Sequence, residues 1–288
     1  MLFVRALLTA GALLAAHVAT AQSDRTSDQC GGEVDRTPLS LAQRLFYNGD
    51  YAQAAALTST ACGSADSLEL CELRTSALLM RLKRDLGEAH QEDPSQTCVR
   101  CQQLIASFVA DTARGQTAAR ARLRTDAADE ATQFLLAKLD LNYVWLQLGV
   151  LGRKTGWREY WEARRSVDKV LKTNPSHLRA RVARAWIDYI VDTRMPLGTR
   201  WLLGGGDKKR GLLTIREAAR ADGHFYARAE AAFALWDVQI REKQIEEAVV
   251  TARRLSCDFP ANEELRRFLQ KHGTTHAPEQ VDHVGDIQ

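Results

Sequence analysis

The sequence predicts an all-α fold built from antiparallel helix pairs, and three observations support this prediction. Helix-favouring residues such as Ala, Leu, Arg, Glu and Lys dominate the chain, which has only 6 Pro in 288 residues. Segments with the alternating pattern of a β-strand are scarce. An alanine precedes a proline by twelve residues at Ala163 and Pro175, and again at Ala248 and Pro260. A helix with a small contact residue that ends before a proline has this pattern.

The first 21 residues have the features of an export signal. Arg5 supplies a positive charge, residues 6–18 form an apolar run too short to span a bilayer, and residues 19–21 read Ala-Thr-Ala, a small-x-small cleavage site. We predict cleavage after Ala21 and a periplasmic or secreted mature protein with no membrane span. The first cysteine is Cys30, so a lipid anchor directly after the cleavage site is not expected. Residues 22–38 are polar and are expected to be flexible.

Helical segments follow one another from residue 39 to residue 272, which we expect to be the folded domain. Apolar residues recur at helical spacing in segments 39–47, 52–62, 67–83, 98–114, 116–124, 129–151, 157–172, 177–191, 207–220, 225–241, 245–257 and 262–271. Turns or linkers are expected at 48–51, 87–97, 152–156 and 195–206, where Gly, Pro or Asn interrupt the pattern. These segments predict about five helix pairs and a C-terminal capping helix. Residues 273–288 lack periodicity and are expected to be disordered.

Several residues match the pattern of a known helical repeat. Trp145, Leu148 and Gly149 reproduce a W-x2-L-G opening, and Gly49 with Ala54 matches an inter-helix turn followed by a small contact residue. On these residues, the chain resembles the tetratricopeptide-repeat (TPR) superfamily. The resemblance implies a right-handed α-solenoid with a structural role for the repeat residues and for Gly211, which is expected at a tight helix contact. The full structural set is Gly49, Ala54, Trp145, Leu148, Gly149, Ala163, Pro175, Gly211, Ala248 and Pro260.

A second resemblance lies in residues 202–212, which read Leu-Leu-Gly-Gly-Gly-Asp-Lys-Lys-Arg-Gly-Leu. This segment resembles the Gly-Gly-Asp segment of bacterial envelope T-component proteins associated with tripartite (TRAP-type) solute transporters, and of a group of eukaryotic outer-membrane repeat proteins. The free amides of 204–206 could bind an anion beside Lys208, Lys209 and Arg210. We favour a turn between helices, with Asp207 as N-cap, because no Gly-Lys-Ser/Thr follows and Asp207 would repel a phosphate.

The chain has six cysteines, and in an exported protein these suggest disulfides. Cys62 and Cys71 flank a short loop and are the best candidate pair. Cys98 and Cys101 have CxxC spacing, for which we favour a structural disulfide over redox catalysis or zinc, because no strand precedes them. Cys30 and Cys257 are not assigned to a pair.

Composition and motifs favour a non-enzymatic protein. The formal charge of +3 falls to +2 when Arg5 is removed with the signal, which gives no general case for binding nucleic acid. The histidines are scattered, and neither HExxH nor GxSxG is present. No catalytic residue, metal site or cofactor is therefore expected. Basic stretches near residues 114–124, 179–184 and 208–210 are interpreted as solvated helix faces or as a rim for an acidic partner or an anionic lipid surface.

Aromatic and charged residues alternate in 157–162 and near 143–145, which suggests a groove that binds a peptide. Packing of Trp145 and Trp161 between repeats is the favoured alternative for these two side chains. The candidate partner-binding residues are Tyr143, Arg158, Glu159, Arg164, Asp188, Tyr189, Asp192 and Arg194. The leading hypothesis is an exported TPR scaffold that binds a protein or peptide partner of the cell envelope in its concave groove. The alternative is a small-molecule-binding accessory protein of a solute transporter, with an apolar cavity near Tyr143, Trp161 and Trp186.

Overall fold

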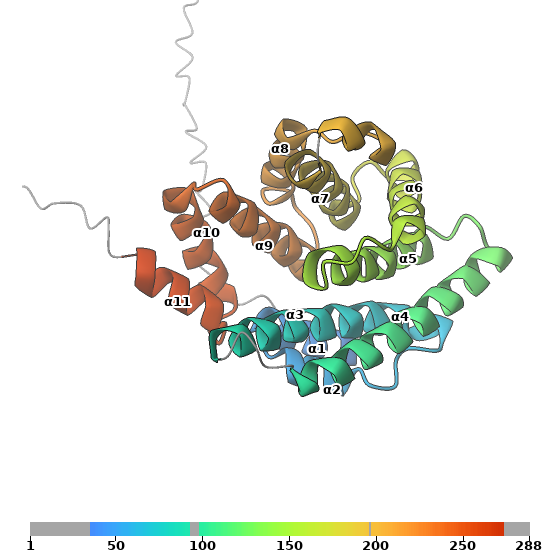
Figure 1. Ribbon diagram of the computed structural model, residues 1–288, viewed down its shortest axis with the longest axis horizontal. Helices are drawn as coiled ribbons and strands as arrows, with labels where there is room; N and C mark the ends of the chain where they lie inside the picture. Colours follow the sequence, from blue (N-terminus) through green and yellow to red (C-terminus); the bar gives the residue numbers. More distant parts are fainter. Residues whose placement is uncertain (1–34, 93–97, 196, 274–288) are drawn as a thin grey trace, which may run out of the picture. The chain divides into compact units, whose positions relative to one another are not determined.

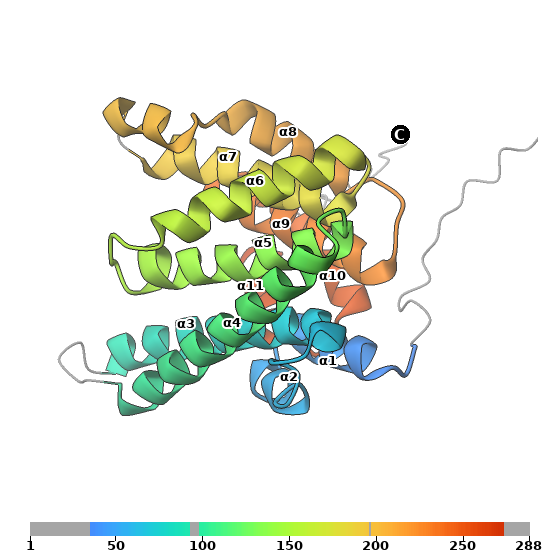
Figure 2. The same ribbon diagram turned by 90° about the vertical axis from the view of Figure 1, so that its right-hand side faces the viewer.

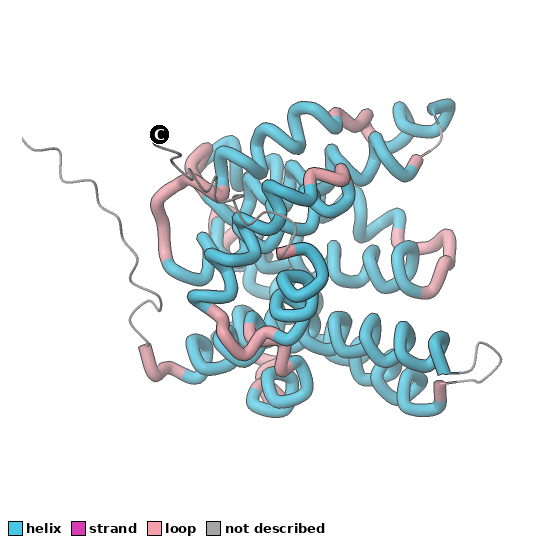
Figure 3. The backbone as a smooth tube through the Cα atoms, turned by 90° about the vertical axis from the view of Figure 1, so that its left-hand side faces the viewer, coloured by secondary structure: helices cyan, strands magenta, loops and turns pink. Residues whose placement is uncertain are grey.

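Eleven α-helices and no strand make up the part of the chain that the computed structural model describes, residues 35–92, 98–195 and 197–273 (Figures 1 and 3). The predicted all-α class is confirmed. The predicted signal segment 1–21, the first part of 22–38 and nearly all of the tail 273–288 lie outside the described residues. Within the described ranges, no helix combines the length and apolarity that a membrane span requires.

The helices follow the order expected from the sequence. They are α1 (Pro38–Tyr47), α2 (Tyr51–Leu57), α3 (Leu68–Glu92), α4 (Val99–Thr125), α5 (Glu130–Val144), α6 (Trp157–Thr173), α7 (Leu178–Arg194), α8 (Lys208–Ala218), α9 (Phe225–Arg241), α10 (Ile245–Asp258) and α11 (Glu263–His272). Short 3₁₀ helices η1 (Ala65–Ser67) and η3 (Leu197–Leu203) lie in two connections, and a π-helical turn η2 (Trp145–Val150) extends α5.

Side-chain caps start many of these helices. Thr37, Asp50, Asp129 and Asn262 each accept a hydrogen bond from the backbone N–H three residues later, at 3.0–3.2 Å. Asp207 caps α8 in the same way as predicted, with Arg210 N at 2.9 Å. Each cap satisfies an amide that has no partner inside its helix, which fixes where the helix begins.

Three predicted boundaries are wrong. The helix expected over 52–62 is α2, which ends at Leu57. α3 continues to Glu92, so the expected linker 87–97 is helical over its first part. The expected segments 98–114 and 116–124 are one continuous helix, α4, with Gly115 in its interior. A Cβ on Gly115 would lie 2.7 Å from Cys71 Sγ and 3.0 Å from Leu139. The glycine therefore lets three helices approach closely and does not end α4.

Consecutive helices pack as pairs, α1 with α2, α3 with α4, α5 with α6, α7 with α8, and α9 with α10 (Figure 2). The first helices of neighbouring pairs also touch, α1 with α3, α3 with α5, and α7 with α9. Ala54, Ala163 and Ala248 are 0% exposed at these contacts. A larger side chain at any of them would separate the packed helices.

The first and last helix pairs of the described chain are in contact. Tyr47 at the end of α1 stacks on Phe233 of α9, with ring centroids 5.4 Å apart, and lies 5.3 Å from the ring of Phe259 after α10. Asn262 Nδ2 donates a 2.7 Å hydrogen bond to the Tyr47 carbonyl. The N-terminal and C-terminal pairs thus share an aromatic core.

A largely buried ionic cluster joins the first helices of four pairs, α3, α5, α7 and α9. Glu72 of α3 and Glu230 of α9 accept from Arg179 of α7, and Lys138 of α5 donates to Glu230 at 2.7 Å. Burial raises the pKa of Tyr47 of α1 well above its usual range, and the Glu230 charge adds to this shift. Burial alone would raise the pKa of Glu230, but Arg179 and Lys138 outweigh it and lower that pKa to about 2. The side chains of this cluster therefore lie between the helices that they connect.

Two disulfides lie in the first half of the chain, as predicted. Cys62 and Cys71 are joined with Cα atoms 4.7 Å apart, and Cys98 and Cys101 with Cα atoms 5.2 Å apart. None of the described cysteines is a free thiol, and Cys257 is disulfide-bonded as well. Cys30 lies outside the described residues. Disulfides fit an oxidising compartment.

Candidate functional site

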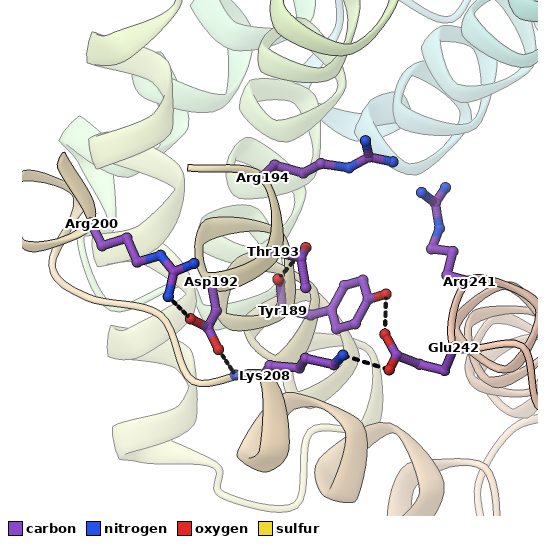
Figure 4. A pocket seen from close by; sticks show the side chains of 8 residues that line it. All are labelled: Tyr189, Asp192, Thr193, Arg194, Arg200, Lys208, Arg241 and Glu242. Carbon is purple, nitrogen blue, oxygen red and sulfur yellow. Dashed lines mark hydrogen bonds and ion pairs between the residues drawn. The ribbon is translucent and has the colours of Figure 1, made fainter. Parts of the chain in front are cut away.

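A polar pocket of about 640 Å³ lies where the C-terminal ends of α7 and α9 meet η3 and the start of α8 (Figure 4). α7 contributes its last turns, η3 one arginine, α8 its first residue, and α9 its last residue and C-cap. The lining residues are Tyr189, Asp192, Thr193, Arg194, Arg200, Lys208, Arg241 and Glu242. The pocket thus combines four cations with two carboxylates.

One end of the pocket neutralises its own charges. Glu242 accepts a 2.8 Å hydrogen bond from Tyr189 Oη and pairs with Lys208 Nζ at 2.6 Å. Burial alone would raise the pKa of Glu242, but hydrogen bonds from Lys208 and Tyr189 lower it. Burial, and then the hydrogen bond to Glu242, raises the pKa of Tyr189 to about 12. Across the neutral range Tyr189 therefore stays a donor and Glu242 stays a charged acceptor.

Asp192 ties two segments of the pocket together. Its Oδ1 pairs with Arg200 of η3, and its Oδ2 accepts from the backbone N–H of Lys208 at 2.9 Å. Arg200 also donates to the Met195 carbonyl at 3.0 Å. Each oxygen of the Asp192 carboxylate thus has a partner within the chain, and the carboxylate fixes η3 against the start of α8.

The other end of the pocket has excess positive charge. Arg194 and Arg241 are the last residues of α7 and α9, and their guanidinium groups extend toward each other across the pocket (Figure 4). Arg241 pairs with Asp237 at 3.1 Å and lies 5.7 Å from the ring of Trp186. Within the described chain, the exposed Arg194 guanidinium has no ion pair or hydrogen bond. Even with Asp237 included, one positive charge remains uncompensated, and an anionic group would balance it.

Arg164 was predicted to belong to the same groove as the pocket residues, but it has a different role. We expected it on an exposed face, and this expectation is wrong, because it is 9% exposed. Its guanidinium donates to the carbonyls of Leu203 at 3.1 Å and Gly204 at 2.8 Å. Gly204 and Gly205 have φ of +77° and +73°, so the loop turns with carbonyls directed at one cation. Arg164 therefore holds the connection between η3 and α8.

The remaining predicted groove residues do not form one continuous surface. Tyr189, Asp192 and Arg194 line the pocket together. Asp188 is 7% exposed and pairs with Arg184, while Glu159 is 8% exposed and pairs with the exposed Arg158. The sequence prediction missed Arg200, Arg241 and Glu242, and it named Lys208 only beside a possible anion-binding loop. Arg241 and Glu242 are charged residues at a helix end, a feature that is common on any solvated helix, and Arg200 lies within η3.

The three aromatic residues of the predicted apolar cavity belong to separate cores. Tyr143 packs with the cluster of α2, α3 and α4, Trp161 with the cluster around Tyr160, and Trp186 with the α7–α9 cluster. The structural repeat residue Gly149 lies under the Trp145 ring, where a Cβ would be 3.2 Å from ring atoms. Trp145 itself packs against the first cluster.

No group of three or more His, Cys, Asp or Glu side chains in the described ranges is placed to hold a metal ion. Comparison of the chain with protein families, with curated proteins and with solved structures gives no match. The candidate function therefore depends on the geometry of the pocket.

Proposed function

We propose that this chain is an exported, non-enzymatic TPR-like scaffold that binds an acidic segment of a protein partner in the pocket between α7, η3, α8 and α9. The observation that carries the proposal is the unpaired guanidinium of Arg194 facing Arg241 across an open, polar pocket. A carboxylate between them would receive charge-assisted hydrogen bonds from two planar donors. The five consecutive helix pairs and α11 support a TPR-type solenoid, and the disulfides support a location in the cell envelope.

The surroundings favour a protein segment over a small ion. Trp201 and Leu202 follow the pocket residue Arg200 and are 72% and 52% exposed. Exposed aromatic residues beside a charged site are typical anchors of protein interfaces. The ionic cluster of Glu72, Lys138, Arg179 and Glu230 links the first helices of four pairs, and the pocket lies apart from it, at the helix ends.

The direct test uses residues 22–288 and a fluorescent hexaglutamate peptide with blocked ends, followed by anisotropy. We expect binding that weakens as salt rises from 50 to 500 mM and falls about tenfold, or ~1.4 kcal/mol, in Arg194→Glu. Arg220→Glu is the matched control, because Arg220 is exposed in the turn after α8 and lies outside the pocket. Equal effects of the two variants would refute a specific site.

A second experiment identifies the partner. Cross-linking of the same chain in envelope extract, read by mass spectrometry, should capture a protein that is lost with Arg194→Glu and with Trp201→Ala and is retained with Arg220→Glu. A small molecule in the released fraction, with no captured protein, would contradict the scaffold proposal and favour the accessory role in solute transport.

A further inference from the structure

We propose that the Cys98–Cys101 disulfide is a reactive site that exchanges with a cysteine pair of a partner protein. The inference is independent of the cationic pocket, which lies on other helices. It rests on the place of the two sulfurs in α4, on their unequal burial, and on the contrast with the second disulfide of the same chain.

Cys98 occupies the N-cap of α4, a helix of 27 residues. Its Sγ already accepts the backbone N–H of Cys101 at 3.2 Å. When the disulfide opens, the Cys98 thiolate would lie at the positive end of the helix dipole, beside the backbone amides of the first turn. The first turn contains no acidic residue, and the exposed Arg100 lies within it. These features stabilise a thiolate and make Cys98 a good leaving and attacking group.

The two sulfurs differ in access. Cys101 is 2% exposed and belongs to the core cluster with Tyr51, Leu104 and Phe108. Cys98 is only partly buried, at the edge of the same cluster. An incoming thiolate therefore meets less burial at Cys98 than at Cys101. This arrangement separates an attacked cysteine from a resolving cysteine, as exchange chemistry requires.

The disulfide between Cys62 and Cys71 is built differently. Cys62 is 9% exposed and Cys71 is 0% exposed. This bridge joins the end of the first pair to α3. The Cys98–Cys101 bridge spans one helical turn that the hydrogen bond from Cys101 N to the Cys98 carbonyl, 3.1 Å long, already closes. It cross-links no separate elements, so it adds less constraint on the unfolded chain.

The exchange proceeds in two displacements. A thiolate of the partner attacks Cys98 Sγ, the Cys98–Cys101 bond breaks, and Cys101 leaves as a thiolate. The second thiolate of the partner then attacks the partner sulfur of the mixed disulfide, which releases the Cys98 thiolate. The partner's dithiol is oxidised to a disulfide by two electrons. Cys98 and Cys101 are reduced and take up the two protons that the partner released.

The test treats oxidised residues 22–288 with a synthetic peptide that carries a Cys-Gly-Pro-Cys dithiol, at pH 7 without denaturant. Free thiols are alkylated at intervals and located by mass spectrometry. We expect peptide oxidation with matching alkylation of Cys98 and Cys101, while Cys62 and Cys71 stay joined. Limiting alkylation of the reduced chain should modify Cys98 before Cys101. Reduction of both bridges at the same rate, or only after unfolding, would overturn the proposal.

Paired variants separate chemistry from folding. Cys98→Ala/Cys101→Ala should lower the rate of peptide oxidation at least tenfold and keep the helical circular-dichroism spectrum. Cys62→Ala/Cys71→Ala should keep the oxidation rate whenever its spectrum remains helical. If Cys98→Ala/Cys101→Ala unfolds, the order in which Cys98 and Cys101 of the reduced wild-type chain are alkylated tests the inference instead. Equal modification of both cysteines would refute it.

Discussion

Lys138 on α5 donates a 2.7 Å hydrogen bond to Glu230 on α9, 92 residues later in the chain. Arg179 of α7 shares the same carboxylate. We expect Glu230→Ala to destabilise the fold by about 1.5–3 kcal/mol, because Glu72 remains as the single carboxylate paired with two largely buried cations. Urea denaturation measures the change. Glu217→Ala is the control, since Glu217 is 54% exposed and pairs with Arg181 on the surface, where about 0–1 kcal/mol is expected.

The same carboxylate predicts sensitivity to acid. The pKa of Glu230 is about 2 in the folded chain against 4.5 for an ordinary glutamate. A lowered folded pKa gives stability that is fully present above pH 4.5 and is lost as pH falls toward 2. The free energy of unfolding should therefore decline over this range, more steeply than in Glu230→Gln. Parallel pH profiles for the two proteins would contradict this assignment.

Asp140 on α5 predicts the opposite dependence. Its side chain is fully buried, Oδ1 accepts from Gln116 at 2.7 Å, and Oδ2 has no hydrogen-bond partner. Burial, and then the charge of Glu162, raises its pKa to about 8 from 3.8. A raised folded pKa removes stability as pH rises from 3.8 to 8, because the unfolded chain releases its proton first. Asp140→Asn should therefore stabilise the chain more at pH 8 than at pH 5, as thermal denaturation at both values would show.

Glycines in two helices should respond to alanine with opposite signs. A Cβ on Gly211 of α8 would lie 2.7 Å from the Ala185 carbonyl of α7. Gly211→Ala should separate these helices and cost about 1–3 kcal/mol. Gly87 in α3 has no atom within 4 Å of a built Cβ, so Gly87→Ala should stabilise by about 0.5–1 kcal/mol. Thermal denaturation distinguishes them, and a neutral Gly211→Ala would show that α7 and α8 pack more loosely than described.

Local sequence patterns predicted the helices well because caps and apolar periodicity act within a few residues. Asp207 and the Cys62–Cys71 pair are examples. The interior position of Gly115 was missed, because its reason is a contact with Cys71 and Leu139 from other helices. The ionic cluster was missed for the same reason. Lys138 lies between Ala137 and Leu139, and Arg179 lies between Leu178 and Ala180. A charged residue between apolar neighbours was the only sequence signal for a buried, paired charge.

The candidate site was predicted only in part. Tyr189, Asp192 and Arg194 lie on one helix, so their proximity follows from the sequence. Lys208 and Arg241 join them through the packing of α7 with α8 and α9, which one sequence does not specify. The burial of Arg164 depends on three consecutive loop carbonyls, and no side-chain pattern encodes such a binding site.

The stacking of Tyr47 on Phe233 bears on how this protein can change in length during evolution. In an open repeat array, whole units can be duplicated or deleted, and stability changes by increments. Here an added or lost unit would pull the two aromatic partners apart and expose both surfaces to water. Natural variants of this protein should therefore differ in their inter-helix loops and keep a constant number of units.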